Sequence, residues 1–121
     1  MLREGADPDD VRMTDVLCDF CHVPWTEDVP FVEGHRGAVI CGGCMRAAYA
    51  EMVLDGRGSA PPDFTCTMCR EGDADRAAIG REGELGWSGP AGTGTCVCRR
   101  CVKQASGVLH KDDDVAWSKP C

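Results

Sequence analysis

The sequence predicts a small α+β fold made of two tandem modules, and three observations carry this prediction. The chain has 121 residues and only seven aromatic side chains, so any apolar core is thin. Ten of its residues are cysteine, a proportion typical of small scaffolds that are cross-linked by disulfides or by metal. The pattern C-x-x-C occurs four times, as CDFC, CGGC, CTMC and CRRC. Cross-links at these cysteines must therefore supply the stability that a thin core cannot.

The four motifs form two successive pairs, and the residues around the second motif of each pair are alike. Nineteen residues separate the motifs of the first pair and 28 separate those of the second. VICGGCMRAAYAEM aligns with CVCRRCVKQASGVL when Cys41 and Cys44 are set on Cys98 and Cys101. The sequence thus predicts a duplicated unit. We expect a flexible acidic N-terminus at 1–13, a first module at 14–56, a linker at 57–63, a second module at 64–111 and an acidic C-terminal tail at 112–121.

Within the first copy, the apolar pattern predicts a β-hairpin followed by a helix. Phe31 and Val32 precede a turn at 34–37, and the apolar run 38–40 follows it. Apolar side chains then recur at helical spacing up to the stop signal at Gly56, namely Met45, Ala48, Tyr49, Met52 and Val53.

The second copy repeats the helix more weakly than the first. Val102, Ala105 and Leu109 form the apolar stripe, although Gly107 costs about 1 kcal/mol of helix propensity. The middle of this copy, GREGELGWSGPAGTG, holds six glycines in fifteen residues. We expect a flexible loop there.

The cysteine spacing predicts structural zinc sites. Thiolates two residues apart on a tight turn, a zinc knuckle, can occupy two corners of the zinc tetrahedron, and two such turns complete it. Residues 1–15 hold no apolar run of the kind a secretory signal needs, so we expect a cytoplasmic protein whose thiols stay reduced. Each module then reads as knuckle, hairpin, second knuckle and helix, the treble-clef order. The expected ligands are Cys18, Cys21, Cys41 and Cys44 for the first zinc, and Cys66, Cys69, Cys98 and Cys101 for the second.

Two cysteines exceed the eight ligand places. Cys96 aligns with Val39, so it is either a small buried apolar residue or a ligand in place of Cys98. Cys121, the last residue, is expected to be a free thiol.

The three histidines are expected to lie outside the metal sites. CDFCH at 18–22 also matches the attachment motif of c-type haem, but the partner motif and the repeat favour zinc, so we expect no haem. His22 then belongs to the knuckle turn and His35 to the hairpin turn. His110 closes the second helix, where a cation complements the helix dipole.

Residues 17–53 resemble the zinc-binding domain at the N-terminus of the ClpX unfoldase. The shared features are the first knuckle with Phe20 inside it, the spacer length, the apolar Ile40 before the second knuckle and the helix that begins there. This resemblance implies a four-cysteine treble clef that dimerises and recognises adaptor or substrate proteins. The chain has no ATPase module, so the resemblance does not extend to unfoldase activity.

Charge and motifs together favour a non-catalytic zinc-binding module for protein interaction. The formal net charge of −7 repels a phosphate backbone, so we expect no nucleic-acid partner, although RRCVK at 99–103 is locally basic. Four thiolates leave no open position for catalysis, and no segment reaches the length of a membrane span. The alternatives are a nucleic-acid-binding zinc finger and a redox sensor in which Cys96 or Cys121 attacks a zinc thiolate. A homodimer is one form that this interaction could take, and the expected interface residues are Tyr49, Met52, Trp87 and Trp117.

Overall fold

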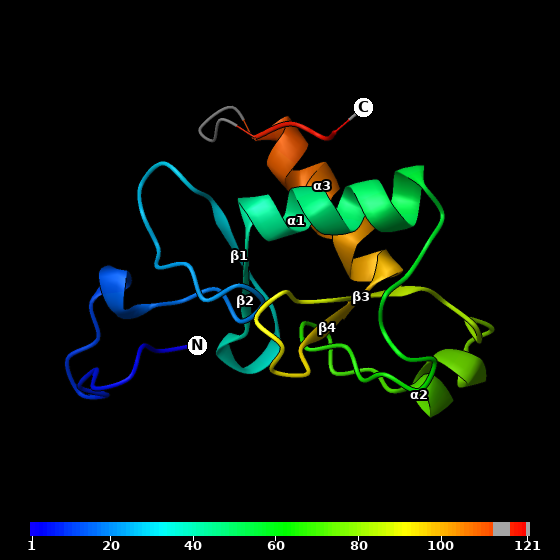
Figure 1. The fold of residues 1–121 in the computed structure, drawn as a ribbon, viewed down its shortest axis with the longest axis horizontal. Coiled ribbons are helices and arrows are strands. Elements are labelled where there is room, and N and C mark those ends of the chain that lie inside the picture. Colours follow the sequence, from blue (N-terminus) through cyan, green and yellow to red (C-terminus); the bar gives the residue numbers. More distant parts are fainter. Residues whose placement is uncertain (113–116, 121) are drawn as a thin grey trace.

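The protein is described by a computed structural model that covers residues 1–112 and 117–120. Two short antiparallel hairpins lie beneath two packed helices, as Figure 1 shows. Short 3₁₀ turns occur at Met13–Asp15 and His35–Gly37. The strands and helices, in chain order, are β1 (Phe31–Glu33), β2 (Val39–Cys41), α1 (Gly42–Tyr49), the π-helical turn η3 (Ala50–Leu54), α2 (Asp73–Ala78), β3 (Gly86–Ser88), β4 (Cys96–Cys98) and α3 (Arg99–Lys111).

The first hairpin confirms the prediction made from its apolar pattern. β1 pairs with β2 so that Val32 faces Ile40. The turn between the strands needs left-handed backbone, with φ of 56° at Arg36 and 73° at Gly37. Glycine adopts this conformation without steric cost, which explains its place at the end of the turn.

α1 and η3 together form the predicted first helix. The helix begins at Gly42, directly after β2, and continues to Leu54, where the last turn widens into a π-helix. Met45, Ala48 and Met52 are fully buried, as the stripe predicts. The helix therefore presents its apolar face to the core.

In the second half, the expected flexible loop is wrong in part, because residues 86–88 form a strand. β3 pairs with β4 so that Trp87 faces Val97. The strand lies against the Phe64 ring, which would be 2.6 Å from a Cβ atom at Gly86, so only glycine allows this approach. The strand depends on contacts with Phe64, 22 positions away in the numbering, which local composition does not reveal.

α3 follows the predicted second helix and passes through Gly107. Val102 and Leu109 are buried, as expected, together with Ser106. A Cβ atom at Gly107 would meet nothing within 4 Å, so glycine is not required there by packing. α2 has no counterpart in the sequence prediction.

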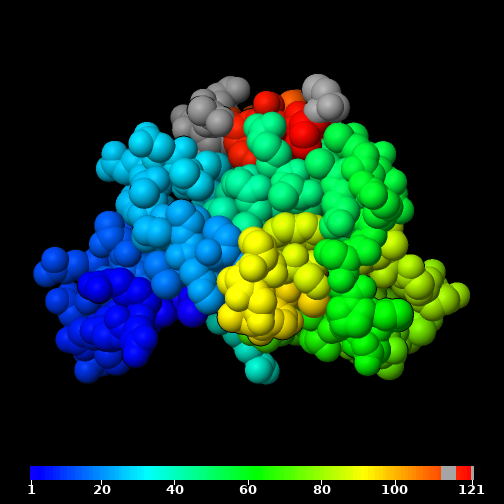
Figure 2. Space-filling view, in the orientation of Figure 1, coloured from blue at the N-terminus to red at the C-terminus, as the bar shows by residue number. Residues whose placement is uncertain are grey.

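The two halves share one apolar core through a pair of reciprocal contacts. The amide of His35, in the first hairpin loop, donates to the carbonyl oxygen of Met68, in the Cys66–Cys69 knuckle turn, at 2.7 Å. The amide of Ala91, in the second hairpin loop, donates to the carbonyl oxygen of Phe20, in the Cys18–Cys21 knuckle turn, at 3.0 Å. The rings of Phe20 and Trp87 lie 6.0 Å apart. In Figure 2 the segment near residue 90 (yellow) lies against the segment near residue 20 (blue).

The expected flexible N-terminus and the expected linker both make defined contacts. The amide of Arg3 donates to the carbonyl oxygen of Asp15, and its side chain pairs with the Asp15 carboxylate at 2.5 Å. In the linker, the amides of Ser59 and Ala60 both donate to the carbonyl oxygen of Gly86 at 3.0 Å. The N-terminus and the linker therefore both contact the modules.

The part of the tail that the structure describes also packs inward. The indole Nε1 of Trp117 donates to the carbonyl oxygen of Gly42 at 2.9 Å, and the Arg46 guanidinium lies 5.8 Å from its ring centroid. The remainder of the predicted tail, residues 113–116 and Cys121, lies outside the described residues. Across those described, no helix combines the length and apolar character needed to cross a bilayer.

Candidate metal centres

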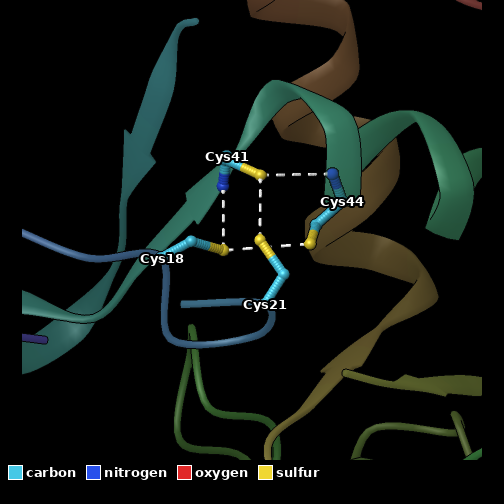
Figure 3. Close-up of side chains that lie close together, drawn as sticks. All are labelled: Cys18, Cys21, Cys41 and Cys44. Carbon is cyan, nitrogen blue, oxygen red and sulfur yellow. Dashed lines mark hydrogen bonds between the residues drawn. The ribbon is translucent and has the colours of Figure 1, made fainter. Parts of the chain in front are cut away.

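The first four-cysteine group is assembled from three elements. Cys18 and Cys21 belong to the turn before the first hairpin, Cys41 ends β2, and Cys44 lies in the first turn of α1, as Figure 3 shows. All four sulfur atoms lie within 4.8 Å of one another. The Sγ atoms of Cys18 and Cys44 are 3.8 Å apart, and those of Cys21 and Cys41 are 3.7 Å apart.

These separations fit a zinc tetrahedron. A tetrahedral site with Zn–S bonds of about 2.3 Å has sulfur–sulfur edges of about 3.8 Å. A disulfide would bring two sulfurs to about 2.05 Å, and the described cysteines are all free. The donor set is also the one that zinc prefers for closed structural sites. The first group therefore fits a metal ion, with zinc the best match to the ligands.

Backbone amides around Cys18 direct their N–H groups at its sulfur. The amide of Phe20 donates to Cys18 Sγ at 3.4 Å and that of Cys41 at 3.3 Å. Hydrogen bonds from the thiols of Cys41 and Cys44 lower the pKa of Cys18 further, far below its ordinary value. His22 closes the turn in the left-handed region, with φ of 65°. The turn is thus built to hold a thiolate.

The second group repeats this arrangement from the second copy. Its members are Cys66, Cys69, Cys98 and Cys101, with sulfurs again within 4.8 Å of one another. The Cys66–Cys101 and Cys69–Cys98 sulfur separations are both 3.9 Å. The amide of Cys98 donates to Cys66 Sγ at 3.4 Å, the counterpart of the bond from Cys41. Hydrogen bonds from the thiols of Cys101 and Cys98 lower the pKa of Cys66 to about 3.

Local backbone confirms that the two groups are copies of one unit. Arg70 follows the Cys66–Cys69 knuckle with φ of 67°, as His22 follows the Cys18–Cys21 knuckle with φ of 65°. Its amide donates to the carbonyl oxygen of Cys66 at 2.8 Å, and the amide of His22 donates to that of Cys18 at the same distance. The predicted duplication therefore extends to the hydrogen bonds of each knuckle.

The groups differ in the charges around them, because arginines lie beside the second. Arg81 Nη2 donates to Cys98 Sγ at 3.7 Å, and the same side chain pairs with Glu71 at 2.5 Å and with Glu84. Arg100 pairs with Glu71 at 2.8 Å. Burial lowers the pKa of Arg100, but a hydrogen bond to Cys69 and the charge of Glu71 outweigh it, so the pKa is raised.

Within the described part of the chain, no arginine hydrogen-bonds to a sulfur of the first group. Arg81, Glu71 and Glu84 were not singled out by the sequence prediction, and Arg100 entered it only as part of the basic segment 99–103. Their only signal was the presence of charged residues near the second pair of knuckles. Their arrangement depends on the way residues 71–85 fold back over Cys98.

Cys96 lies outside both groups. It is 4% exposed, and its thiol contacts the Ser88 hydroxyl at 3.6 Å and the Gly94 carbonyl at 3.8 Å. The structure brings Cys98 into the second group in its place. Cys96 therefore matches the expectation of a small buried residue, whereas Cys121 lies outside the described residues.

The histidines also lie outside both groups. The Nδ1 atom of His110, at the end of α3, accepts a hydrogen bond from the amide of Lys119 at 3.1 Å. His35 lies in the hairpin turn, where its backbone contacts the opposite half.

The expected interface residues are mostly interior. Met52, Trp87 and Trp117 are 1%, 9% and 8% exposed, so these three side chains offer a partner little surface. Each tryptophan has a surface to pack on that the sequence alone does not reveal: Trp87 covers Phe20 from the other half, and Trp117 covers the start of α1. Tyr49 is half-buried, with the Lys119 ammonium 6.0 Å from its ring centroid.

Comparison of the chain with known proteins found no relative. No protein family matches the chain, and no curated protein and no solved structure matches it with statistical significance.

Proposed function

We propose that the chain is a non-catalytic protein-interaction module that is stabilised by two structural zinc ions. The observation that carries this proposal is the geometry of the two cysteine groups, whose sulfur separations of 3.7–3.9 Å match the edges of a zinc tetrahedron. With four thiolates each, neither site leaves a corner for water or substrate, which a catalytic zinc needs.

The zinc ions would act here as cross-links within a thin core. Three elements meet at each cysteine group, so one metal ion would hold the knuckle, the hairpin and the helix together. Structural zinc contributes on the order of 10–16 kcal/mol of apparent binding free energy in zinc-finger peptides. Because folding creates the site, that energy stabilises the folded chain.

An interaction role is supported by the resemblance of the first half to a domain that recognises other proteins. The resemblance of residues 17–53 to the ClpX zinc-binding domain suggests an adaptor-like role, and we propose a cytoplasmic setting, where thiols stay reduced and can bind zinc. A homodimer remains a prediction of that resemblance. The redox-sensor alternative also remains a prediction, although burial of Cys96 makes its thiol hard for an oxidant to reach.

Nucleic-acid binding is the second candidate, and one observation favours it. α3 carries Arg99, Arg100, Lys103 and Lys111 and no acidic residue. The net charge of −7, which becomes −11 when eight thiolates bind two Zn²⁺ ions (−7 − 8 + 4), opposes it.

Affinity capture with the zinc-loaded protein separates these candidates. We expect a specific protein to be retained, retention to be lost after zinc is removed by a chelator, and retention to survive nuclease treatment. Salt-sensitive binding to a generic oligonucleotide, with no protein retained, would contradict the proposal. Fewer than two zinc ions per chain by elemental analysis would contradict its structural basis.

A further inference from the structure

A groove of about 370 Å³ lies between β1 and α3, where the two halves meet. We call it the β1–α3 groove. One wall comes from the first half and the other from the knuckle and helix of the second. Its apolar surface comes from Val32, Met68, Ala105 and Val108. Val108 is 68% exposed, the highest value among the exposed large apolar side chains of the described chain.

The equivalent surface of the other half is covered by the chain itself. There the linker runs between η3 and β3, which correspond in the repeat to α3 and β1. The amide of Arg57 donates to the carbonyl oxygen of Glu51, and the hydroxyl of Ser59 donates to the Glu51 carboxylate. Ser59 also accepts from the amide of Ser88, at 2.9 Å, and its own amide donates to Gly86. An extended segment thus bridges helix and strand.

In the part of the chain that the structure describes, no such segment lies on the outer edge of β1. The amide of Gly42 donates to the carbonyl oxygen of Pro30, and the amide of Gly34 donates to that of Ala38. These two residue pairs are therefore hydrogen-bonded pairs of the hairpin, which alternate with pairs that are not hydrogen-bonded to each other. By the alternation of an antiparallel ladder, the peptide groups of Phe31 and Glu33 then point to the outer edge. Across residues 1–112 and 117–120, no backbone hydrogen bond from another segment reaches these two residues. Their counterparts in β3 are the residues that bind the linker.

The chain's own C-terminal segment follows another course where it is described. In the repeat alignment Trp117 corresponds to Ala60, which binds the edge of β3. Trp117 instead lies on α1 and donates to Gly42. Among residues 1–112 and 117–120, no segment covers the β1–α3 groove in the way that the linker covers its counterpart.

Charge and apolar character indicate what the groove accepts. Glu51, which binds the linker, is replaced by Val108 at the equivalent position of α3. Four exposed cations are close in sequence to residues that line the groove. They are Arg36, beside His35; Arg70, beside Cys69; Lys103, beside Gln104; and Lys111, one helical turn beyond Val108. Among the residues that line the groove, Glu33 is the one acid.

We propose that the β1–α3 groove binds an extended peptide segment of a partner protein, which adds to the outer edge of β1. The segment carries apolar side chains that contact Val32, Met68 and Val108, flanked by acidic residues that face the surrounding cations. Main-chain hydrogen bonds to the edge would provide affinity, and the groove would provide specificity. The inference rests on the proposed function and names the partner chemistry.

The test is selection of binders from a random-sequence peptide library on the zinc-loaded protein, followed by titration of an enriched peptide into the ¹⁵N-labelled protein. We expect enriched peptides to combine apolar and acidic residues, and the amides of Phe31 and Glu33 to shift and to exchange more slowly. Val108→Glu should weaken binding by at least about tenfold, because it places a carboxylate against an acidic peptide. Ile79→Glu is the matched control, since Ile79 is 59% exposed and lies outside the groove, and it should leave affinity within about twofold.

Several results would overturn the inference. These are a library without enrichment, enriched peptides that are basic, equal binding by Val108→Glu, or unchanged amides at Phe31 and Glu33. An oligonucleotide that shifts the same amides, or a concentration-dependent shift without peptide, would assign the edge to nucleic acid or to a second copy instead. If a captured partner binds Val108→Glu as well as the wild type, the groove assignment fails and the proposed function stands. Loss of zinc from the wild type would undermine both.

Discussion

The backbone amide of His35 donates a 2.7 Å hydrogen bond to the carbonyl oxygen of Met68, and this contact joins the hairpin of one half to the knuckle of the other. Its counterpart runs from Ala91 to Phe20. Each knuckle turn, which holds two of the four ligand cysteines of its own half, is therefore also held by the opposite half. The stability of the two metal groups is expected to be coupled for this reason.

Gly34→Ala tests the contact between the halves. A Cβ atom there would lie 2.6 Å from the Met68 carbonyl oxygen and 3.0 Å from its Cα atom, so the backbone would have to shift. We expect the free energy of unfolding of the zinc-loaded protein to fall by about 1–3 kcal/mol. Chemical denaturation measures this change.

The control for that variant is Gly107→Ala. Gly107 lies within α3, and an added Cβ atom would meet nothing within 4 Å. Alanine there should raise stability by about 0.5–1 kcal/mol through helix propensity. Equal effects of the two substitutions would contradict a tight contact at Gly34.

The identity of the second-site ligands is tested by Cys98→Ser and Cys96→Ser. Cys98 belongs to the second sulfur group, whereas the thiol of Cys96 contacts Ser88 and Gly94. Native mass spectrometry should therefore find two zinc ions on the Cys96 variant and one on the Cys98 variant. The reverse pattern would make Cys96 the ligand.

Arg81→Met tests whether the arginines stabilise the second metal group. Arg81 donates to Cys98 Sγ and is held by Glu71 and Glu84. Loss of a group that hydrogen-bonds to a ligand commonly lowers metal affinity by about 10–100-fold, so one of the two zinc ions should become easier for a chelator to remove.

Arg57→Met serves as the comparison, because Arg57 is 73% exposed and pairs only with the surface residue Asp55 among the salt bridges of the described chain. Chelator competition should leave its two zinc ions with wild-type affinity. If both variants release zinc alike, Arg81 has no special role at Cys98.

Trp117→Ala tests whether the tail contributes to the core. The indole is 8% exposed and donates to the Gly42 carbonyl oxygen. Truncation should lower the free energy of unfolding by about 3 kcal/mol, whereas Trp117→Phe, which keeps most of the ring contact, should lower it by about 1 kcal/mol. Both variants should retain two zinc ions, since Trp117 belongs to neither cysteine group. A Trp117→Ala protein as stable as the wild type would show that the indole contributes nothing to the core.

The sequence by itself determined how eight cysteines divide into two groups of four. Knuckle spacing and the position of Cys41 and Cys44 at the start of a helix are local, because each depends on a few residues that are close in the chain. The same holds for the first hairpin and for the stripe at Met45 and Met52. Periodicity and turn chemistry report such features directly.

Only the tertiary structure decided how the copies meet. β3 forms in a glycine-rich segment because Phe64 and the linker cover it, and Trp87 and Trp117 are buried because distant segments provide surfaces for them. The arginines beside Cys98 and the uncovered edge of β1 likewise depend on residues far apart in the chain. These contacts form because one half packs against the other. The local pattern of residues along the sequence cannot predict which distant segments will meet.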